Sequence, residues 1–194
     1  LYGVICMLNV DTKYKHMEQL AAYREELKKK PLLKNLLLEL TLRCNERCLH
    51  CGSSCGDVKS EELILEQYKA FLDEVKEDFG TKGFMLCITG GEPLLRKDFF
   101  DIMGYAHKLG FKWGMTSNGT LITPEVADKL YESGMSTISV SIDGLEKTHD
   151  AFRQTPGGYR KAMEGIQNLI NVGKRNAIQT SVFINNKCNL FFTL

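Results

Sequence analysis

The sequence predicts an α/β fold built around a parallel sheet. Short apolar runs alternate with stretches of helical periodicity, which is typical of β-α-β units joined by right-handed crossovers. A length of 194 residues suits one domain with its own core. Polar or glycine-rich clusters follow every expected strand, and ligands bind at that end of the strands in open α/β sheets and in α/β barrels alike. The absence of Gly-x-Gly-x-x-Gly after the first strand weighs against a dinucleotide-binding sheet.

Five segments have the length and composition of buried strands. They are short, mostly apolar and bounded by Gly, Asn or Asp, as expected for strands covered on both faces. They comprise residues 36–41, 84–89, 112–117, 137–142 and 178–184.

Helices are expected before and between these strands, and most have recognisable ends. The expected helices are residues 65–79, a segment from Asp98 as N-cap to Gly110, a segment from Thr123 as N-cap to Gly134, residues 159–172 with Gly173 as the stop, and an earlier amphipathic helix over residues 16–29.

Composition and charge restrict the possible partners. The net charge of +1 provides no electrostatic footprint for nucleic acid or an anionic membrane, and no segment approaches the roughly 20 apolar residues of a membrane span. The opening LYGVICML lacks the features of a signal peptide. Seven cysteines, four of them in one short segment, favour a metal site in a reducing, cytosolic setting over a disulfide scaffold.

The segment CNERCLHCGSSC, from Cys44 to Cys55, contains the densest group of soft ligands. Two interpretations are open. A structural zinc site usually joins two ligand pairs that are a dozen or more residues apart, and no second pair is present here. An iron–sulfur cluster takes thiolates from closely spaced positions, and three ligands would leave one iron open for chemistry. Cys55 could fill that fourth position.

The motif Cys44-x3-Cys48-x2-Cys51 at the end of the first strand resembles the cluster motif of the radical S-adenosylmethionine (radical SAM) enzymes. The resemblance extends over roughly residues 36–172. It includes the GGEP, TSNG and SIDG segments at residues 90–93, 116–119 and 141–144, and continues through HD at 149–150, Arg153 and GGY at 157–159. It is greatest to the branch that modifies peptides and proteins and often carries a C-terminal SPASM extension.

This resemblance implies a fold, a chemistry and a set of partners. The fold is a (β/α)6 TIM-like barrel, here partial, with about five βα units. Cys44, Cys48 and Cys51 would ligate a [4Fe-4S] cluster, whose open iron binds S-adenosylmethionine and cleaves it reductively to a 5'-deoxyadenosyl radical. Ferredoxin or flavodoxin would donate the electron in an anaerobic cytoplasm, and the substrate would be a peptide or protein.

The resemblance also implies cofactor contacts at the strand ends. Gly90 and Gly91 would let the backbone approach S-adenosylmethionine, and Glu92 would supply a carboxylate to its amino group. A tight turn into the next helix is the alternative. Ser117 and Asn118 would bond the ribose or the amino acid part of the cofactor, unless they are only strand-end turn residues.

Three further residues complete the expected cofactor site. Ser141 would act as Ser117 and Asn118 do. Arg153 would form a fork to the cofactor carboxylate, the alternative being a surface arginine beside Asp150. His50 would pack over the adenine or else point to solvent.

The domain interpretation is a helical lead-in over residues 1–34 and an incomplete radical SAM barrel over residues 35–194. Since the chain begins at Leu1 and no sixth strand follows, we expect a fragment of a longer protein. The alternative functions are a non-enzymatic zinc-binding module with Cys55 as fourth ligand, and an inactive truncated homologue.

Overall fold

A computed structural model describes residues 10–30, 32–57 and 60–176 of the chain. The chain divides into two compact units, Leu1–Lys34 and Asn35–Leu194. Each unit is described by itself below.

The second unit contains a four-stranded parallel sheet in the order β1-β2-β3-β4. The strands are β1 (Asn35–Glu39), β2 (Met85–Thr89), β3 (Trp113–Ser117) and β4 (Met135–Val140). Leu38 pairs with Ile88, Ile88 with Met115, and Met115 with Ile138, so one apolar row crosses the whole sheet. Four expected strands are confirmed within two residues at each end, and the expected strand at 178–184 lies outside the described residues.

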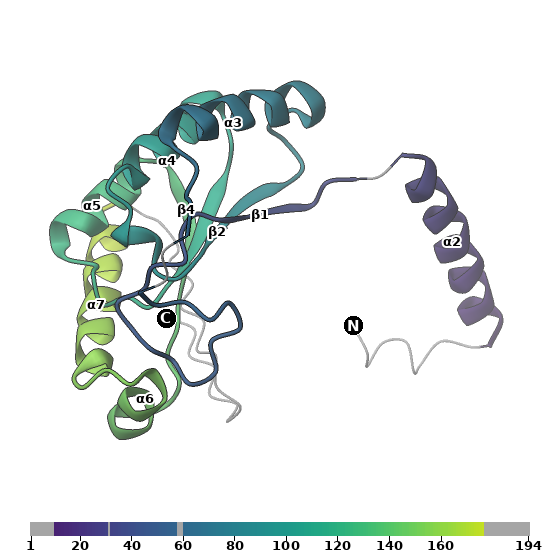
Figure 1. The fold of residues 1–194 in the computed structure, drawn as a ribbon. Helices are drawn as coiled ribbons and strands as arrows, with labels where there is room; N and C mark the ends of the chain where they lie inside the picture. Colours follow the sequence, from purple (N-terminus) through teal and green to yellow (C-terminus); the bar gives the residue numbers. More distant parts are fainter. Residues whose placement is uncertain (1–9, 31, 58–59, 177–194) are drawn as a thin grey trace. The chain divides into compact units, whose positions relative to one another are not determined.

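Helices cover one face of this sheet (Figure 1). The helices are α3 (Leu65–Phe79), α4 (Phe99–Leu109), α5 (Pro124–Glu132), α6 (Glu146–Arg153) and α7 (Gly158–Asn176), and a 3-10 turn, η1, spans Pro93–Leu95. In Figure 1, α3, α4, α5 and α7 form an arc along the sheet. The core lies between the two layers and includes Leu86, Ile88, Ile102, Leu72 and Leu130.

The strands are not equally buried on their two faces, contrary to the expectation from their apolar composition. Leu38 is 9% exposed, whereas its neighbour Leu37 is 68% exposed. Thr116 is likewise exposed, between buried Met115 and buried Ser117. Successive side chains point to opposite faces of a strand, and the helices described here cover only one of these faces.

The ends of the helices follow the sequence signals in part. Thr123 caps α5, because its side chain accepts a hydrogen bond from the Val126 amide. Gly110 ends α4 in the left-handed region, with φ 97°. The Asp98 side chain makes no cap bond and instead pairs with Arg96.

The last two helices of the described chain differ from the sequence analysis, which ended one of them too early and did not predict the other. Helix α7 passes through Gly173 and ends at Asn176, because one glycine costs a helix only about 1 kcal/mol. Helix α6 has no counterpart in the sequence analysis. The side chains that it buries are His149 and Arg153, so it carries no apolar periodicity by which to recognise it.

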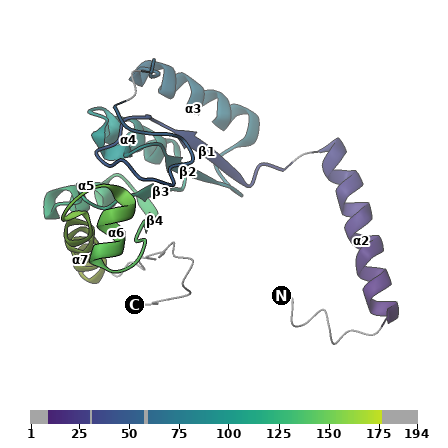
Figure 2. The ribbon, with the colours of Figure 1, turned by 60° about the horizontal axis from the view of Figure 1, so that its bottom comes forward.

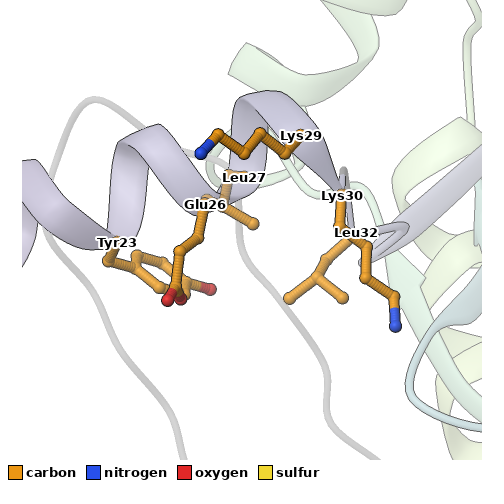
Figure 3. Close-up of a pocket in the computed structure, with 6 residues that line it drawn as sticks. All are labelled: Tyr23, Glu26, Leu27, Lys29, Lys30 and Leu32. Carbon is orange, nitrogen blue, oxygen red and sulfur yellow. The ribbon is translucent and has the colours of Figure 1, made fainter.

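The first unit contains helix α2 (Val10–Lys29), which begins six residues earlier than expected and buries none of its residues. A hollow of about 350 Å³ lies at its C-terminal end, lined by Tyr23, Glu26, Leu27, Lys29, Lys30 and Leu32. Figure 3 shows these side chains around the last turns of the helix. None of them belongs to the predicted site. Of the helices in the described ranges, none has both the length and the apolar character to cross a membrane.

Candidate functional site

The predicted site residues gather around the C-terminal ends of the four strands. The cysteine loop (residues 44–56) follows β1 and extends to α6, as the dark-blue segment of Figure 1 shows. Its base is closed by two backbone hydrogen bonds, from the Cys44 amide to the Gly56 carbonyl at 3.1 Å and from the Gly56 amide to the Leu42 carbonyl at 3.0 Å.

Gly90 and Gly91 bring the end of β2 against the start of the cysteine loop. The Gly91 amide donates to the Thr41 carbonyl at 2.7 Å, and the Glu92 amide donates to the Arg43 carbonyl at 2.9 Å. A Cβ atom on Gly91 would lie 2.2 Å from the Arg43 carbonyl oxygen, and one on Gly90 would lie 2.4 Å from the Thr41 oxygen. The close approach that requires glycine here is therefore between two strand-end loops of the protein itself.

Glu92 is fully buried among the loops at the C-terminal ends of the strands. Its carboxylate accepts hydrogen bonds from the amides of Leu94 and Asn118, at 3.3 and 2.8 Å, and from the Ser117 hydroxyl at 3.0 and 3.1 Å. Burial raises its pKa to about 7, against the opposing effect of these hydrogen bonds. Glu92 thus joins the end of β2 to the end of β3.

Asn118 connects the end of β3 to the cysteine loop. Its Nδ2 donates to Asn45 Oδ1 at 2.8 Å and lies 4.0 Å from Cys44 Sγ, while its Oδ1 accepts from Thr120. The Asn45 amide group in turn donates to the Thr120 hydroxyl at 2.8 Å. Ser141 joins this edge through its backbone, since its amide donates to the Ser117 carbonyl at 3.0 Å.

Arg153 is buried and lies between two carboxylates. Its Nε donates to Asp143 at 2.7 Å and its Nη1 donates to Glu46 at 2.8 Å. The alternative of a surface arginine beside Asp150 is wrong, because Asp150 accepts from the amides of Gly157 and Tyr159 at the start of α7. Among the described residues, Nε and Nη1 are the Arg153 nitrogens that make these bonds, and Nη2 has no hydrogen bond to them.

His50 lies at the exposed side of the cysteine loop. Its Nε2 is 3.7 Å from Asp143, and its ring centroid is 5.7 Å from that of Phe152 on α6. The imidazole side chain is 47% exposed, so both a stacked ligand and solvent have access to it.

The thiols of the cysteine loop are half-buried and free of disulfides. Cys48 Sγ is 3.8 Å from Glu46, and Cys51 Sγ accepts from the Cys55 amide at 3.2 Å. Burial raises the pKa of Cys44, that of Cys48 to about 11 and that of Cys55 to about 12, so binding of a metal at thiolates would release protons.

Within the described ranges, no three His, Cys, Asp or Glu side chains lie close enough together to hold a metal ion. The donor set nevertheless fits an iron–sulfur cluster. Four thiols, those of Cys44, Cys48, Cys51 and Cys55, share one loop, and they lie partly exposed at the C-terminal ends of the strands, where ligands bind.

Three residues of this region were absent from the predicted site, namely Glu46, Asp143 and His149. Glu46 lies between two cysteines of the motif and is 1% exposed. His149 is fully buried, and its Nδ1 accepts from the Asp143 amide at 3.2 Å. Asp143 stands inside the SIDG segment, so its position was recognisable, whereas its contact with Arg153 was not.

Comparison with known proteins places this geometry in a family. Residues 38–187 match the model of the radical SAM superfamily. The chain belongs to this superfamily. An AdoMet-dependent heme synthase of Methanosarcina barkeri is 41% identical over 146 residues, which are 74% of this chain and 41% of that protein. The mycofactocin maturase MftC of Mycolicibacterium smegmatis is 39% identical over 145 residues, 73% of this chain and 36% of that protein.

Solved structures agree on the fold. Native anSMEcpe with bound AdoMet matches with a TM-score of 0.62 and 23% identity, over 78% of this chain and 43% of that one. A second structure of the same protein holds AdoMet together with the Kp18Cys peptide. The fold is thus part of a radical SAM barrel. The chain spans about two fifths of the length of the curated relatives it matches. Radical SAM membership implies S-adenosylmethionine and an iron–sulfur cluster as cofactors.

Proposed function

We propose that this chain is the catalytic core of a radical SAM enzyme that modifies a peptide or protein. The observation that carries the proposal is the position of the Cys44-x3-Cys48-x2-Cys51 loop. The loop follows β1. Arg43, which leads into it, bonds the Glu92 amide, and Asn45 within it bonds Asn118, at the C-terminal ends of the strands, where α/β barrels bind ligands.

Cys44, Cys48 and Cys51 would hold a [4Fe-4S] cluster, with S-adenosylmethionine beside it. When bound, the cluster supplies the electron that cleaves S-adenosylmethionine reductively to a 5'-deoxyadenosyl radical. Cys55 stays off the ligand set in this proposal, since it lies outside the Cys44-x3-Cys48-x2-Cys51 motif.

The remaining residues would orient the cofactor. Gly90 and Gly91 hold Glu92 against Thr41 and Arg43, which lead into the cysteine loop, and the Glu92 carboxylate would attract the cofactor's amino group. Arg153 would offer Nη2 to the cofactor's carboxylate.

Four further side chains belong to the same proposal. Ser117, Asn118 and Ser141 would bond the ribose or amino acid part. His50 would pack against the adenine, for which its exposed ring has room.

The proposed substrate class rests on the relatives, and a second class has support of its own. The anSMEcpe structure with a peptide supports a peptide or protein substrate. The 41% identity to an AdoMet-dependent heme synthase favours a tetrapyrrole as the second candidate. We propose an electron donor of the ferredoxin or flavodoxin type and a cytoplasmic setting, because a low-potential cluster needs both a reductant and protection from oxygen.

A pair of cysteine variants tests the proposed chemistry. The protein is reconstituted anaerobically with iron and sulfide, and formation of 5'-deoxyadenosine is followed after reduction. C48A should lose the cluster absorbance near 400 nm and the product completely, whereas the matched C55A should keep both. A C48A protein that retains activity would contradict the proposal. Zinc bound to the wild type, with the cluster absorbance absent, would support the zinc-binding module instead.

A further inference from the structure

The cysteine loop is attached to α6 by two backbone hydrogen bonds. The Arg47 amide donates to the Arg153 carbonyl at 3.2 Å, and the Leu49 amide donates to the Phe152 carbonyl at 2.9 Å. These carbonyls belong to the last turn of α6, where helical carbonyls lack partners within the helix. Figure 2 shows α6 beside α7 at the β4 edge of the sheet.

Glu46 is the buried side chain at this attachment. It belongs to the cysteine loop, and the Arg153 that it contacts is 107 positions away in the sequence. The Glu46 side chain is 0% exposed and that of Arg153 is 8% exposed. A hydrogen bond between two charged groups contributes more than a neutral one, and leaving either group unpaired in the interior is costly.

Arg153 is itself held in place from the other side. Its Nε donates to Asp143, whose backbone amide donates to the buried ring of His149. The guanidinium is therefore also held by the segment that follows β4 and by α6, on which Arg153 lies. Glu46 is the loop's side-chain connection to this fixed group.

The second carboxylate oxygen of Glu46 has a different environment. Among the described residues, Glu46 Oε1 is buried and has no hydrogen-bond partner. It lies 3.3 Å from the position of a Cβ atom on Gly158, the first residue of α7. The N-terminus of a helix carries a partial positive charge, so this position favours a carboxylate over a neutral group.

We propose that Glu46 is a positioning residue that holds the cysteine loop against α6 through Arg153, so that the loop is pre-organised to receive the cluster. This inference rests on the proposed function for the identity of the cluster. The attachment itself is a property of the apo-protein and is open to measurement without any cofactor.

The test compares E46Q with D57N. Gln keeps the size of Glu46 and removes its charge. D57N removes a different, exposed ion pair of this region, in which the Asp57 side chain is 92% exposed and meets Arg47. Hydrogen exchange of single amides is measured by NMR on the apo-protein, and iron and sulfide per chain are measured after anaerobic reconstitution.

In E46Q the amides of Arg47 and Leu49 should exchange about ten- to a hundredfold faster, the effect of losing one charge-assisted hydrogen bond. Amides of β3 and α4 should keep their wild-type rates, which separates local release of the loop from general destabilisation. Cluster loading at limiting iron should fall in E46Q, and D57N should match the wild type in both measurements. Unchanged exchange and unchanged loading in E46Q would overturn the proposal.

Two further outcomes are informative. If E46Q does not fold, R153K replaces it, because Lys keeps the charge but lacks the fork that joins Glu46 to Asp143. R153K should speed hydrogen exchange at the Arg47 and Leu49 amides, and wild-type exchange rates at both would overturn the inference. A wild-type protein that binds no cluster would contradict the proposed function, while the exchange data would still decide whether Glu46 attaches the loop.

Discussion

Two buried glutamates at the same edge of the sheet are held in opposite ways. Glu92 engages both carboxylate oxygens with donors from its own turn and from β3. Glu46 engages one oxygen with Arg153 and, within the described part of the chain, leaves the other unpartnered. The first joins two rigid strand ends, and the second joins a loop to a helix. A fully hydrogen-bonded carboxylate and a half-bonded one thus both lie around the predicted cofactor site.

The largest expected effect comes from adding a side chain at Gly91, where the backbone before Glu92 passes close to the Arg43 carbonyl. A Cβ atom at Gly91 would lie 2.2 Å from a backbone oxygen, which has no side-chain freedom with which to move away. We expect G91A to destabilise the apo-protein by about 3 kcal/mol or more and to abolish cluster loading. Thermal and urea unfolding with iron analysis measure both effects.

Gly104 provides the matched control, since a Cβ atom there meets nothing within 4 Å. G104A in α4 should leave cluster loading unchanged and stabilise the protein by about 0.5–1 kcal/mol. A G91A protein as stable as G104A would show that the two strand-end loops are not packed as described.

Removal of the Glu92 side chain should be next in size. E92A leaves the donors of Ser117, Asn118 and Leu94 buried without their acceptor. We expect a loss of about 3 kcal/mol in the free energy of unfolding at pH 6. S141A is the comparison, because in the described residues its side chain has no hydrogen bond, and it should change apo-protein stability by less than about 0.5 kcal/mol. Equal stabilities of the two variants would contradict the scaffold role of Glu92.

The charge on Glu92 should appear in the pH dependence of stability. Its pKa of about 7 in the folded protein lies above the usual value of about 4.3 in an unfolded chain. The folded state therefore keeps this proton longer, and the resulting stabilisation, present at low pH, is lost as the pH rises from about 4 through 7.

E92Q should remove this dependence. Relative to the wild type, its free energy of unfolding should rise between pH 5 and pH 8 by up to about 3 kcal/mol. Taking the difference between the two proteins cancels other titrating groups, such as His149, whose pKa burial lowers. Parallel stability curves across this range would mean that Glu92 is ionised throughout.

The smallest expected effect concerns Asn45, whose side chain joins the cysteine loop, to which Glu46 belongs, to the Asn118 turn that bonds Glu92. Asn45 bonds Asn118 and Thr120 but is itself exposed. N45A should cost about 1 kcal/mol or less, since water replaces part of the lost hydrogen bonding. Its effect on hydrogen exchange should be confined to the Asn118 turn. Faster exchange of the Arg47 and Leu49 amides in N45A would mean that the Asn118 turn and the attachment of the cysteine loop to α6 open as one unit.

The sequence was informative about the elements and much less so about their contacts. Four strands were predicted within two residues, because apolar runs bounded by turn residues are local signals. Helix α6 was missed, because a helix that buries His149 and Arg153 lacks an apolar stripe. The Arg153 contact with Glu46 joins positions 107 residues apart, and no local pattern encodes it.

The same limit applies to the glycine turn. The GGE run predicts that the backbone comes close to a neighbour, and the resemblance implies that this neighbour is S-adenosylmethionine. The structure places the Thr41 and Arg43 carbonyls beside the two glycines, and their contact with the cofactor stays a prediction. Local composition indicates that space is needed, whereas the identity of the neighbour depends on how β1 and β2 are paired.

The most direct test of the proposed function is an electron paramagnetic resonance spectrum of the anaerobically reconstituted, reduced protein with and without S-adenosylmethionine. Three protein ligands and one open iron predict a [4Fe-4S]⁺ signal that changes when S-adenosylmethionine is added. A cluster signal that does not respond would contradict this assignment and point to Cys55 as a fourth ligand. The C55A variant would then be expected to restore the response.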